Sequence, residues 1–297
     1  MTAAAVIIRS CNESALIGRT LAGVLAQDFP GGLEVIVVDS GSTDGTLEIV
    51  RSFGTVRLVE MAPADFTYGR ALNLGARHAS PETAWLAFLS AHAVPLDQSW
   101  LRNLVAPMMR QPEVAGVYGR QIPWPEHMEN RIVRYLARNG YRECYGEFSF
   151  VSREAQYFSN ANAAVRRECW QAQAFDEKLP YAEDWKWCRD IQRSGWAIAY
   201  VAEAAAWHSH AESSRQFLRR RRSEERGRMA LTSPPPPRQR CWHYAYAVLQ
   251  SVRRNVRLYR QGRLPAGAFV DALVTEWLIT TAVYLEHRKP AASPNAA

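Results

Sequence analysis

Polar side chains follow two short apolar segments near the start of the chain. The segments cover 6–9 and 35–38, and the stretch between them has the pattern of a helix. Ligands of parallel sheets bind beyond the carboxyl ends of the strands. The polar side chains expected at those ends are Asn12, Glu13, Asp39, Ser40 and Ser42. This is where a nucleotide would bind.

Two further groups of titratable side chains could do chemistry. Glu183 and Asp184 stand at the start of a predicted helix, where a carboxylate can act as a general base or can cap the helix. His92 follows one apolar run, and His208 and His210 follow another. These side chains are titratable groups that could do chemistry, but their positions alone do not assign their roles.

Strands and helices alternate up to about residue 120. We expect strands near 4–9, 34–39, 56–60, 84–89 and 115–120, and helices near 13–27, 43–53, 69–79 and 97–110. This alternation is typical of an α/β fold with a mainly parallel central sheet. The pattern is irregular from 121 to 180. A helix is then predicted from Glu183 to Gly195, and a strand over 197–201.

The C-terminal part has a different character. Prolines 234–237 form a stiff break, and two helical segments follow near 240–262 and 266–287. The tail after Pro290 is predicted to be disordered. We expect an α/β domain over 1–228, a Pro-rich linker over 229–239 and a helical C-terminal appendage over 240–289.

The chain carries a formal net charge of +7, and its arginines cluster between 219 and 263. An anionic partner is favoured, whereas the lack of a nucleic-acid motif argues against nucleic acid. Trp242, Tyr244 and Tyr246 interleave with these arginines. This pattern fits a helix on a membrane surface, but it also fits a helix that packs on the core or forms a homodimer. Both interpretations stay open.

Two observations bear on location. No apolar run approaches the roughly 20 residues that cross a bilayer, and the N-terminus has no signal-peptide pattern. The five cysteines are scattered and form no CxxC motif, which fits reduced thiols in the cytoplasm. The prediction is a cytoplasmic protein that could also bind peripherally to the inner face of the plasma membrane.

Several motifs taken together resemble an inverting family-2 glycosyltransferase of the GT-A fold. The similarity begins with Asn12-Glu13, the Val-Val-Asp-Ser-Gly-Ser-Thr-Asp-Gly-Thr block at 37–46, Glu183-Asp184 and His208-Ser209-His210. Further motifs resemble its rhamnosyltransferase-like branch: Phe66-x-x-Gly69-Arg70-x-x-Asn73, Gly119-Arg120-Gln121-x-Pro123 and Ser159-Asn160-Ala161-Asn162. The similarity covers about residues 3–225.

The resemblance implies a role for each candidate residue. Asp39 would accept the imide N–H of uracil or thymine, and the alternative for it is a cap of its own loop. Asp184, with Glu183 beside it, would be the general base. The other nucleotide contacts would be Arg9, Asn12, Glu13, Ser40, Ser42, Arg70, Asn73 and Ser90. The sugar or acceptor contacts would be Arg120, Asn160, Asn162 and Trp185.

The expected metal site departs from the family pattern. Where the family has Asp-x-Asp to hold Mn²⁺ or Mg²⁺, this chain has Ser90 and His92. His92 could ligate the metal together with His208 or His210. Alternatively, His92 could contact the diphosphate directly as a cation, without a metal.

The sequence therefore predicts transfer of a sugar, with inversion, from a dTDP- or UDP-sugar to an acceptor hydroxyl. One candidate donor is dTDP-rhamnose, and one candidate acceptor is a lipid-linked cell-surface glycan. Two alternatives remain: a soluble transferase that acts on a small-molecule acceptor, and a non-catalytic protein that binds nucleotide sugars.

Overall fold

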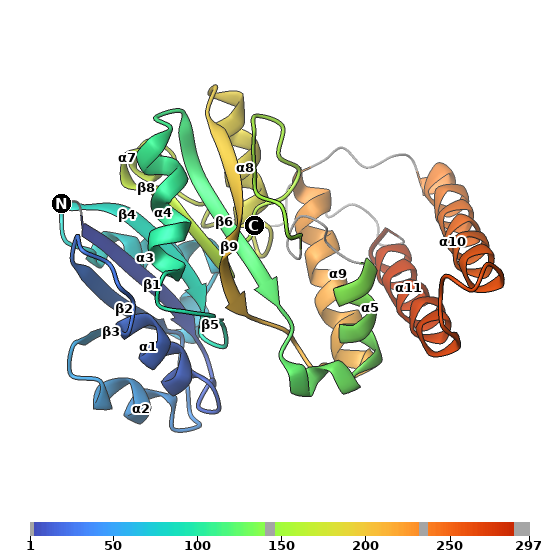
Figure 1. Ribbon diagram of the computed structural model, residues 1–297, viewed down its shortest axis with the longest axis horizontal. Helices are drawn as coiled ribbons and strands as arrows, with labels where there is room; N and C mark the ends of the chain where they lie inside the picture. Colours follow the sequence, from blue (N-terminus) through green and yellow to red (C-terminus); the bar gives the residue numbers. More distant parts are fainter. Residues whose placement is uncertain (1–2, 140–145, 232–236, 288–297) are drawn as a thin grey trace. The chain divides into compact units, whose positions relative to one another are not determined.

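The computed structural model describes residues 3–139, 146–231 and 237–287 (Figure 1). The chain divides into two compact units. The first contains 1–124 and 141–209, and the second contains 125–140 and 210–297. Helix α9 (Ser214–Leu231) therefore groups with the C-terminal helices, although the sequence suggested a boundary near residue 228.

A nine-stranded sheet forms the centre of the first unit, in the order β3-β2-β1-β4-β8-β6-β9-β5, with β7 paired to β9. The strands are β1 (Ala3–Ser10), β2 (Leu33–Asp39), β3 (Val56–Glu60), β4 (Thr83–Ser90), β5 (Val94–Pro95), β6 (Val114–Ile122), β7 (Phe150–Ser152), β8 (Asn162–Arg166) and β9 (Ala197–Trp207). The pairs among β3, β2, β1 and β4 are parallel, as is β6 with β9, and β8 runs antiparallel between β4 and β6.

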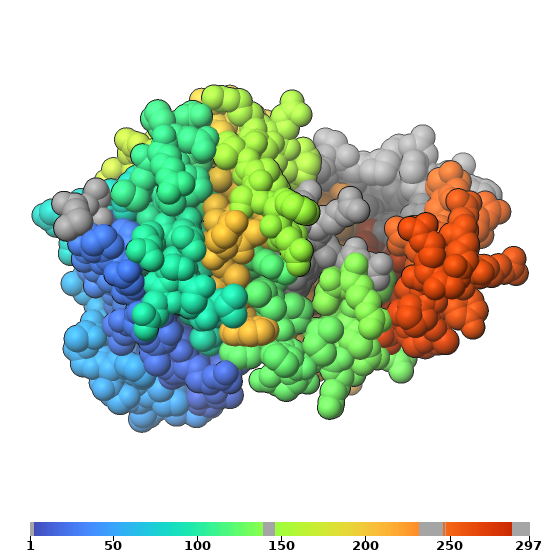
Figure 2. Space-filling view, in the orientation of Figure 1, coloured from blue at the N-terminus to red at the C-terminus, as the bar shows by residue number. Residues whose placement is uncertain are grey.

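Side chains of β1 alternate between the two faces of the sheet. Val6 and Ile8 pack with α1 (Ile17–Leu25), α2 (Thr46–Ser52) and α4 (Trp100–Arg110). Ile7 packs on the other face with α3 (Tyr68–His78), α7 (Arg167–Ala172) and α8 (Glu183–Arg193). Figure 2 shows the blue-green residues of α4 on the surface that faces the viewer. Burial on both faces explains why these strands read as continuous apolar runs.

The five predicted N-terminal strands and four predicted helices are all present, with shifted ends. The region that seemed irregular, 121–180, contains β7, β8 and α7 of the sheet unit. Strand β8 escaped prediction because its five residues, Asn-Ala-Ala-Val-Arg, carry too little apolar periodicity. It makes the sheet mixed rather than parallel throughout.

The second unit consists of helices. These are η2 (Pro125–Glu129), α5 (Arg131–Asn139), α9 (Ser214–Leu231), α10 (Pro237–Arg260) and α11 (Ala266–His287). Helix α11 packs against α5, α9 and α10. Ile132, Phe217 and Leu278 form the apolar core. Three of the four prolines of the predicted break, 234–236, lie outside the described residues, and so does the tail after Pro290 that was predicted to be disordered.

Helix α11 corrects one expectation from the sequence. Ala266–Glu286 is long and apolar enough to cross a membrane, with a mean hydropathy of 1.4. One such helix is weak support for a membrane span, because core helices of soluble proteins have the same composition. Three acidic side chains of α11 also pair with other helices. Asp271 binds Arg134, Glu276 binds Arg254, and Glu286 binds Arg222.

Candidate functional site

The carboxyl ends of β1, β2 and β4 lie at one edge of the sheet. The parallel register pairs Ser10 with Asp39, and Arg9 with Ser90. Asp39 is 1% exposed, and its Oδ1 accepts hydrogen bonds from the backbone N–H groups of Gly41 (2.9 Å) and Ser42 (2.7 Å). Its Oδ2 accepts the Ser42 hydroxyl at 2.6 Å. Asp39 thus orders its own loop, and Oδ2 retains capacity for one more donor.

The loop after β1 joins the loop after β2. The Asn12 N–H donates to Ser42 Oγ (2.7 Å), and Asn12 Oδ1 accepts from the Thr43 N–H (2.8 Å). Asn12 has φ 55°, which is an uncommon value outside glycine. The Ser40 hydroxyl donates to the Ser10 carbonyl at 3.2 Å. Asn12, Asp39, Ser40 and Ser42 therefore belong to one ordered rim of hydrogen-bonded loop residues.

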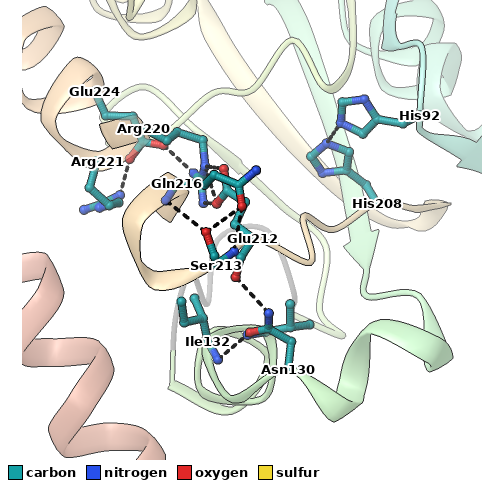
Figure 3. A network of polar contacts seen from close by, with 11 residues as sticks. His92, Asn130, Ile132, His208, Glu212, Ser213, Gln216, Arg220, Arg221 and Glu224 are labelled. Atoms are coloured by element: carbon teal, nitrogen blue, oxygen red, sulfur yellow. Dashed lines mark hydrogen bonds and ion pairs between the residues drawn. The ribbon is translucent and has the colours of Figure 1, made fainter. Parts of the chain in front are cut away.

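Two histidines meet beside this rim (Figure 3). His92 and His208 approach through their Nε2 atoms, 3.1 Å apart. His92 Nδ1 contacts Glu13 Oε1 at 2.8 Å, and His208 Nδ1 contacts Gln121 Oε1 at 2.7 Å. A carboxylate and an amide oxygen can only accept, so each Nδ1 carries the proton. Glu13 and Gln121 thereby fix the tautomers of both rings.

This arrangement fits a cation. With Nδ1 protonated, a neutral ring has its lone pair on Nε2, and two facing lone pairs repel unless a proton or a metal lies with them. The separation of 3.1 Å also suits two imidazoles on one metal at about 2.1 Å each. His210 follows His208 by two residues. Nitrogens of His92, His208 and His210 lie within 4.8 Å of one another, forming a potential metal-binding group among the described residues.

The carboxylate pair stands at the N-terminus of α8. Asp184 Oδ2 accepts the Asn160 N–H at 3.2 Å, and Glu183 Oε1 contacts Asn160 Nδ2 at 3.4 Å. Arg9, near the end of β1, forms an ion pair with Glu183 at 3.5 Å. Ala182 precedes the pair with φ 68°, a strained value of the kind that clusters at functional sites. Arg9 therefore ties the edge of the sheet to α8.

Burial and the neighbouring charge of Glu183 raise the pKa of Asp184 to about 8. The residue as a whole keeps some exposed surface, but its carboxyl group is densely surrounded by protein. The N–H groups of Asn160 and Trp185 and the charge of Arg9 oppose the rise in pKa. The result is a carboxyl group whose pKa lies near neutral pH, as a general base requires.

Asn73 does not fit the predicted nucleotide contact. Its Nδ2 donates to the Phe175 carbonyl (2.8 Å) and to Glu177 (3.0 Å), while Oδ1 accepts from Trp170 Nε1 and the Phe175 N–H. The amide has no capacity left for a ligand. Gly69, from the same motif, lies so close to the Asp176 carbonyl that a Cβ would be 2.5 Å away. The motif on α3 therefore holds the loop that leads to Glu183.

Asn162 requires the same correction. It is fully buried; its Nδ2 donates to the carbonyls of Arg120 (3.0 Å) and Ala204 (2.8 Å), and its Oδ1 accepts from Trp100 Nε1. Asn162 thereby links strands β6 and β9, and its amide has no hydrogen-bonding capacity left for a sugar. A Cβ on Gly119 would lie 2.5 Å from the Asn162 amide nitrogen, which explains the glycine of that motif.

The remaining predicted residues lie as follows. Arg70 is exposed and pairs with Asp65. Arg120 pairs with Glu147, Ser90 ends β4, and Trp185 lies near the ring of Tyr157. None of these contacts tests a role in binding substrate.

Sequence reasoning missed two kinds of residue. Gln121 was seen only as part of a motif, yet it orients His208. Tyr68 was not noticed at all; Arg9 stacks on its ring at 4.4 Å, and Tyr181 packs edge-on against it. An aromatic residue at a helix start carries no local signal of such a contact.

Known proteins match this chain over most of its length. The sequence profile described as "Glycosyltransferase like family 2" matches residues 2–227. The O-antigen chain rhamnosyltransferase RfbN of Salmonella typhimurium is 29% identical over 225 residues, covering 72% of this chain and 68% of RfbN. The O-antigen chain rhamnosyltransferase WbaN of Salmonella anatum is 28% identical over 193 residues, covering 63% and 60%. The chain thus spans about two thirds of these relatives.

Solved structures share the fold. The mannosyltransferase PcManGT from Pyrobaculum calidifontis, in complex with GDP-Man and Mn²⁺, has a TM-score of 0.63 at 19% identity and covers 96% of this chain and 88% of its own. S. aureus TarS 1–349 has a TM-score of 0.55 at 16% identity and covers 95% and 90%. Both similarities confirm the predicted GT-A fold.

Proposed function

Because this chain belongs to the family-2-like glycosyltransferases, we propose that it transfers a sugar with inversion, using Asp184 as the general base. The protein is a glycosyltransferase with a nucleotide-sugar donor. The observation that carries the proposal is the buried Asp184 carboxyl group, held by the Asn160 N–H and raised in pKa beside Glu183. In a single displacement the attacking hydroxyl needs one positioned base with a pKa near the working pH.

The nucleotide would bind at the rim formed by the loops after β1 and β2. Asp39 is the candidate for the base, because its Oδ2 can accept one more hydrogen bond, such as that from the imide N–H of uracil or thymine. If Asp39 accepts the imide N–H of uracil or thymine, the donor is a UDP- or dTDP-sugar. The named relatives are rhamnosyltransferases, which makes dTDP-rhamnose the first donor to test.

A divalent metal would be held by His92 and His208, with His210 as a third ligand. Solved relatives of the same fold contain Mn²⁺. When bound, such a metal neutralises the diphosphate leaving group. The chain itself supplies Glu13 and Gln121, which keep both Nδ1 atoms protonated and both Nε2 atoms available.

The acceptor would be a growing glycan on a lipid carrier. RfbN and WbaN are named as acting on the O-antigen chain, and the second unit of this chain carries a basic helical surface. An enzyme of this kind would work in the cytoplasm at the inner face of the membrane.

A donor panel tests the proposal. Purified protein is incubated with dTDP-rhamnose, UDP-glucose, UDP-N-acetylglucosamine and GDP-mannose, each with Mn²⁺, and release of the nucleoside diphosphate is measured with a lipid-linked glycan acceptor. The proposal expects turnover with a dTDP- or UDP-sugar, an inverted anomer by NMR, and loss of turnover in Asp184→Asn. A retained anomeric configuration, or full activity of Asp184→Asn, would overturn it.

A further inference from the structure

The charged side chains of helix α10 and of the loop after it are all positive. Between Pro237 and Pro265 the sequence has seven arginines and no aspartate or glutamate. The arginines are Arg238, Arg240, Arg253, Arg254, Arg257, Arg260 and Arg263. The segment therefore has nothing of its own to balance the positive charge.

The arginines of the second unit differ in their partners. On α9, Arg220 and Arg221 bind Glu224, and Arg222 binds Glu286. Figure 3 shows Arg220 and Arg221 on either side of Glu224. Among the described side chains, Arg253, Arg257, Arg260 and Arg263 are exposed and form no ion pair. The positive charge on α10 and the loop after it thus remains available to an anion outside the unit.

Apolar and aromatic side chains lie exposed on the same two helices. On α10, Tyr246 is 63% exposed, and Leu249, Val252 and Tyr259 are also exposed. On α11, Trp277 is 61% exposed, and Val270 and Tyr284 lie seven residues to either side of it. A spacing of seven residues places these three along one side of α11. Exposed Tyr and Trp beside arginines are the composition that prefers the headgroup level of a membrane.

The buried side of α10 faces α11. Asn255, which is 2% exposed, donates to Glu276, and Arg254 pairs with the same carboxylate. The acids of α11 are also bound to α5 and α9 through Arg134 and Arg222. These contacts hold α11 among its neighbours, so the unit suits a position on a membrane better than a span through it.

We propose that the exposed side of α10 and α11 docks the protein onto an anionic phospholipid surface. The arginines would bind lipid phosphates, and Trp277 with the exposed tyrosines would enter the headgroup layer. The inference deepens the proposed function, because it rests on an acceptor that is lipid-linked and explains how the enzyme reaches it. The binding itself requires neither donor nor acceptor.

Vesicle binding tests this surface. The full chain is mixed with phosphatidylcholine vesicles, with or without phosphatidylglycerol, and sedimented. The double variant Arg257→Glu/Arg260→Glu is compared with Arg110→Glu/Arg138→Glu, which changes the net charge equally at exposed arginines on α4 and α5. Each arginine near an anionic surface contributes about fivefold in affinity, so the first variant should lose at least about 25-fold. The control should stay within about twofold of wild type.

The other outcomes are equally informative. Equal binding to neutral and anionic vesicles, or equal loss in both double variants, would overturn the proposal. So would resistance to extraction by alkaline carbonate, which would indicate that α11 spans the bilayer. A dimer by light scattering that the Arg257/Arg260 variant dissociates, without vesicle binding, would make the surface an interface between two copies. Asp184→Asn should bind vesicles normally, so failure of the proposed transfer reaction is distinguishable from failure of docking.

Discussion

The raised pKa of Asp184 predicts a steep dependence of activity on pH. A general base works in its ionised form, so kcat/KM should rise as pH increases through the pKa of about 8. At pH 6 about 1% of the carboxyl groups are ionised, and at pH 8 about half. We therefore expect kcat/KM to increase by at least about tenfold between pH 6 and pH 8, and to level off at more alkaline pH.

The neighbouring charges give the matched controls. Glu183→Gln removes the negative charge that helps to raise the pKa of Asp184. The pH range over which kcat/KM rises, the rising limb of the profile, should therefore move to lower pH. Arg9→Gln removes a positive charge that lowers this pKa, so the limb should move to higher pH. A purely structural effect of either change would lower the rate without moving the limb.

The assay is release of nucleoside diphosphate at subsaturating donor, between pH 5.5 and 9.5, at saturating Mn²⁺ so that metal affinity does not limit the rate. Asp184→Asn should reduce kcat by about 10² to 10⁴ while leaving donor affinity nearly unchanged. A flat profile between pH 6 and 9 would refute the reasoning, as would an Asp184→Asn enzyme within a few-fold of wild type.

Three further predictions concern binding and stability. Asp39→Ala should weaken dTDP or UDP binding by about 1–3 kcal/mol in calorimetry, and equal affinity would remove Asp39 from the nucleotide site. His92→Ala should abolish Mn²⁺-dependent donor binding while His92→Asp retains it; a wild-type enzyme fully active in excess EDTA would instead make His92 a direct diphosphate contact. Asn162→Ala should lower the free energy of unfolding by at least about 3 kcal/mol in urea titrations, because two backbone carbonyls and the Trp100 indole N–H lose their partner. A loss under 1 kcal/mol would contradict the assigned bridging role.

The sequence by itself determined the framework of the first unit. Strands β1, β2 and β4 are buried on both faces, so each reads as an apolar run and ends where polar residues begin. The polar residues after these strands had to meet at one edge, because parallel strands share the direction of their carboxyl ends. The motifs also indicated the family, which the profile match confirms.

Only the tertiary structure decided what each polar side chain does. Asn162 stands in the same motif as Asn160, and Asn73 stands in another, but an asparagine in a motif does not reveal whether its amide faces a ligand or a carbonyl. Long-range packing saturates the first two and leaves Asn160 beside the carboxylates. The same packing joins residues far apart in sequence, His92 to His208 and Arg9 to Glu183. The pKa of Asp184 depends on this packing, because desolvation and neighbouring charge arise only when the chain has folded.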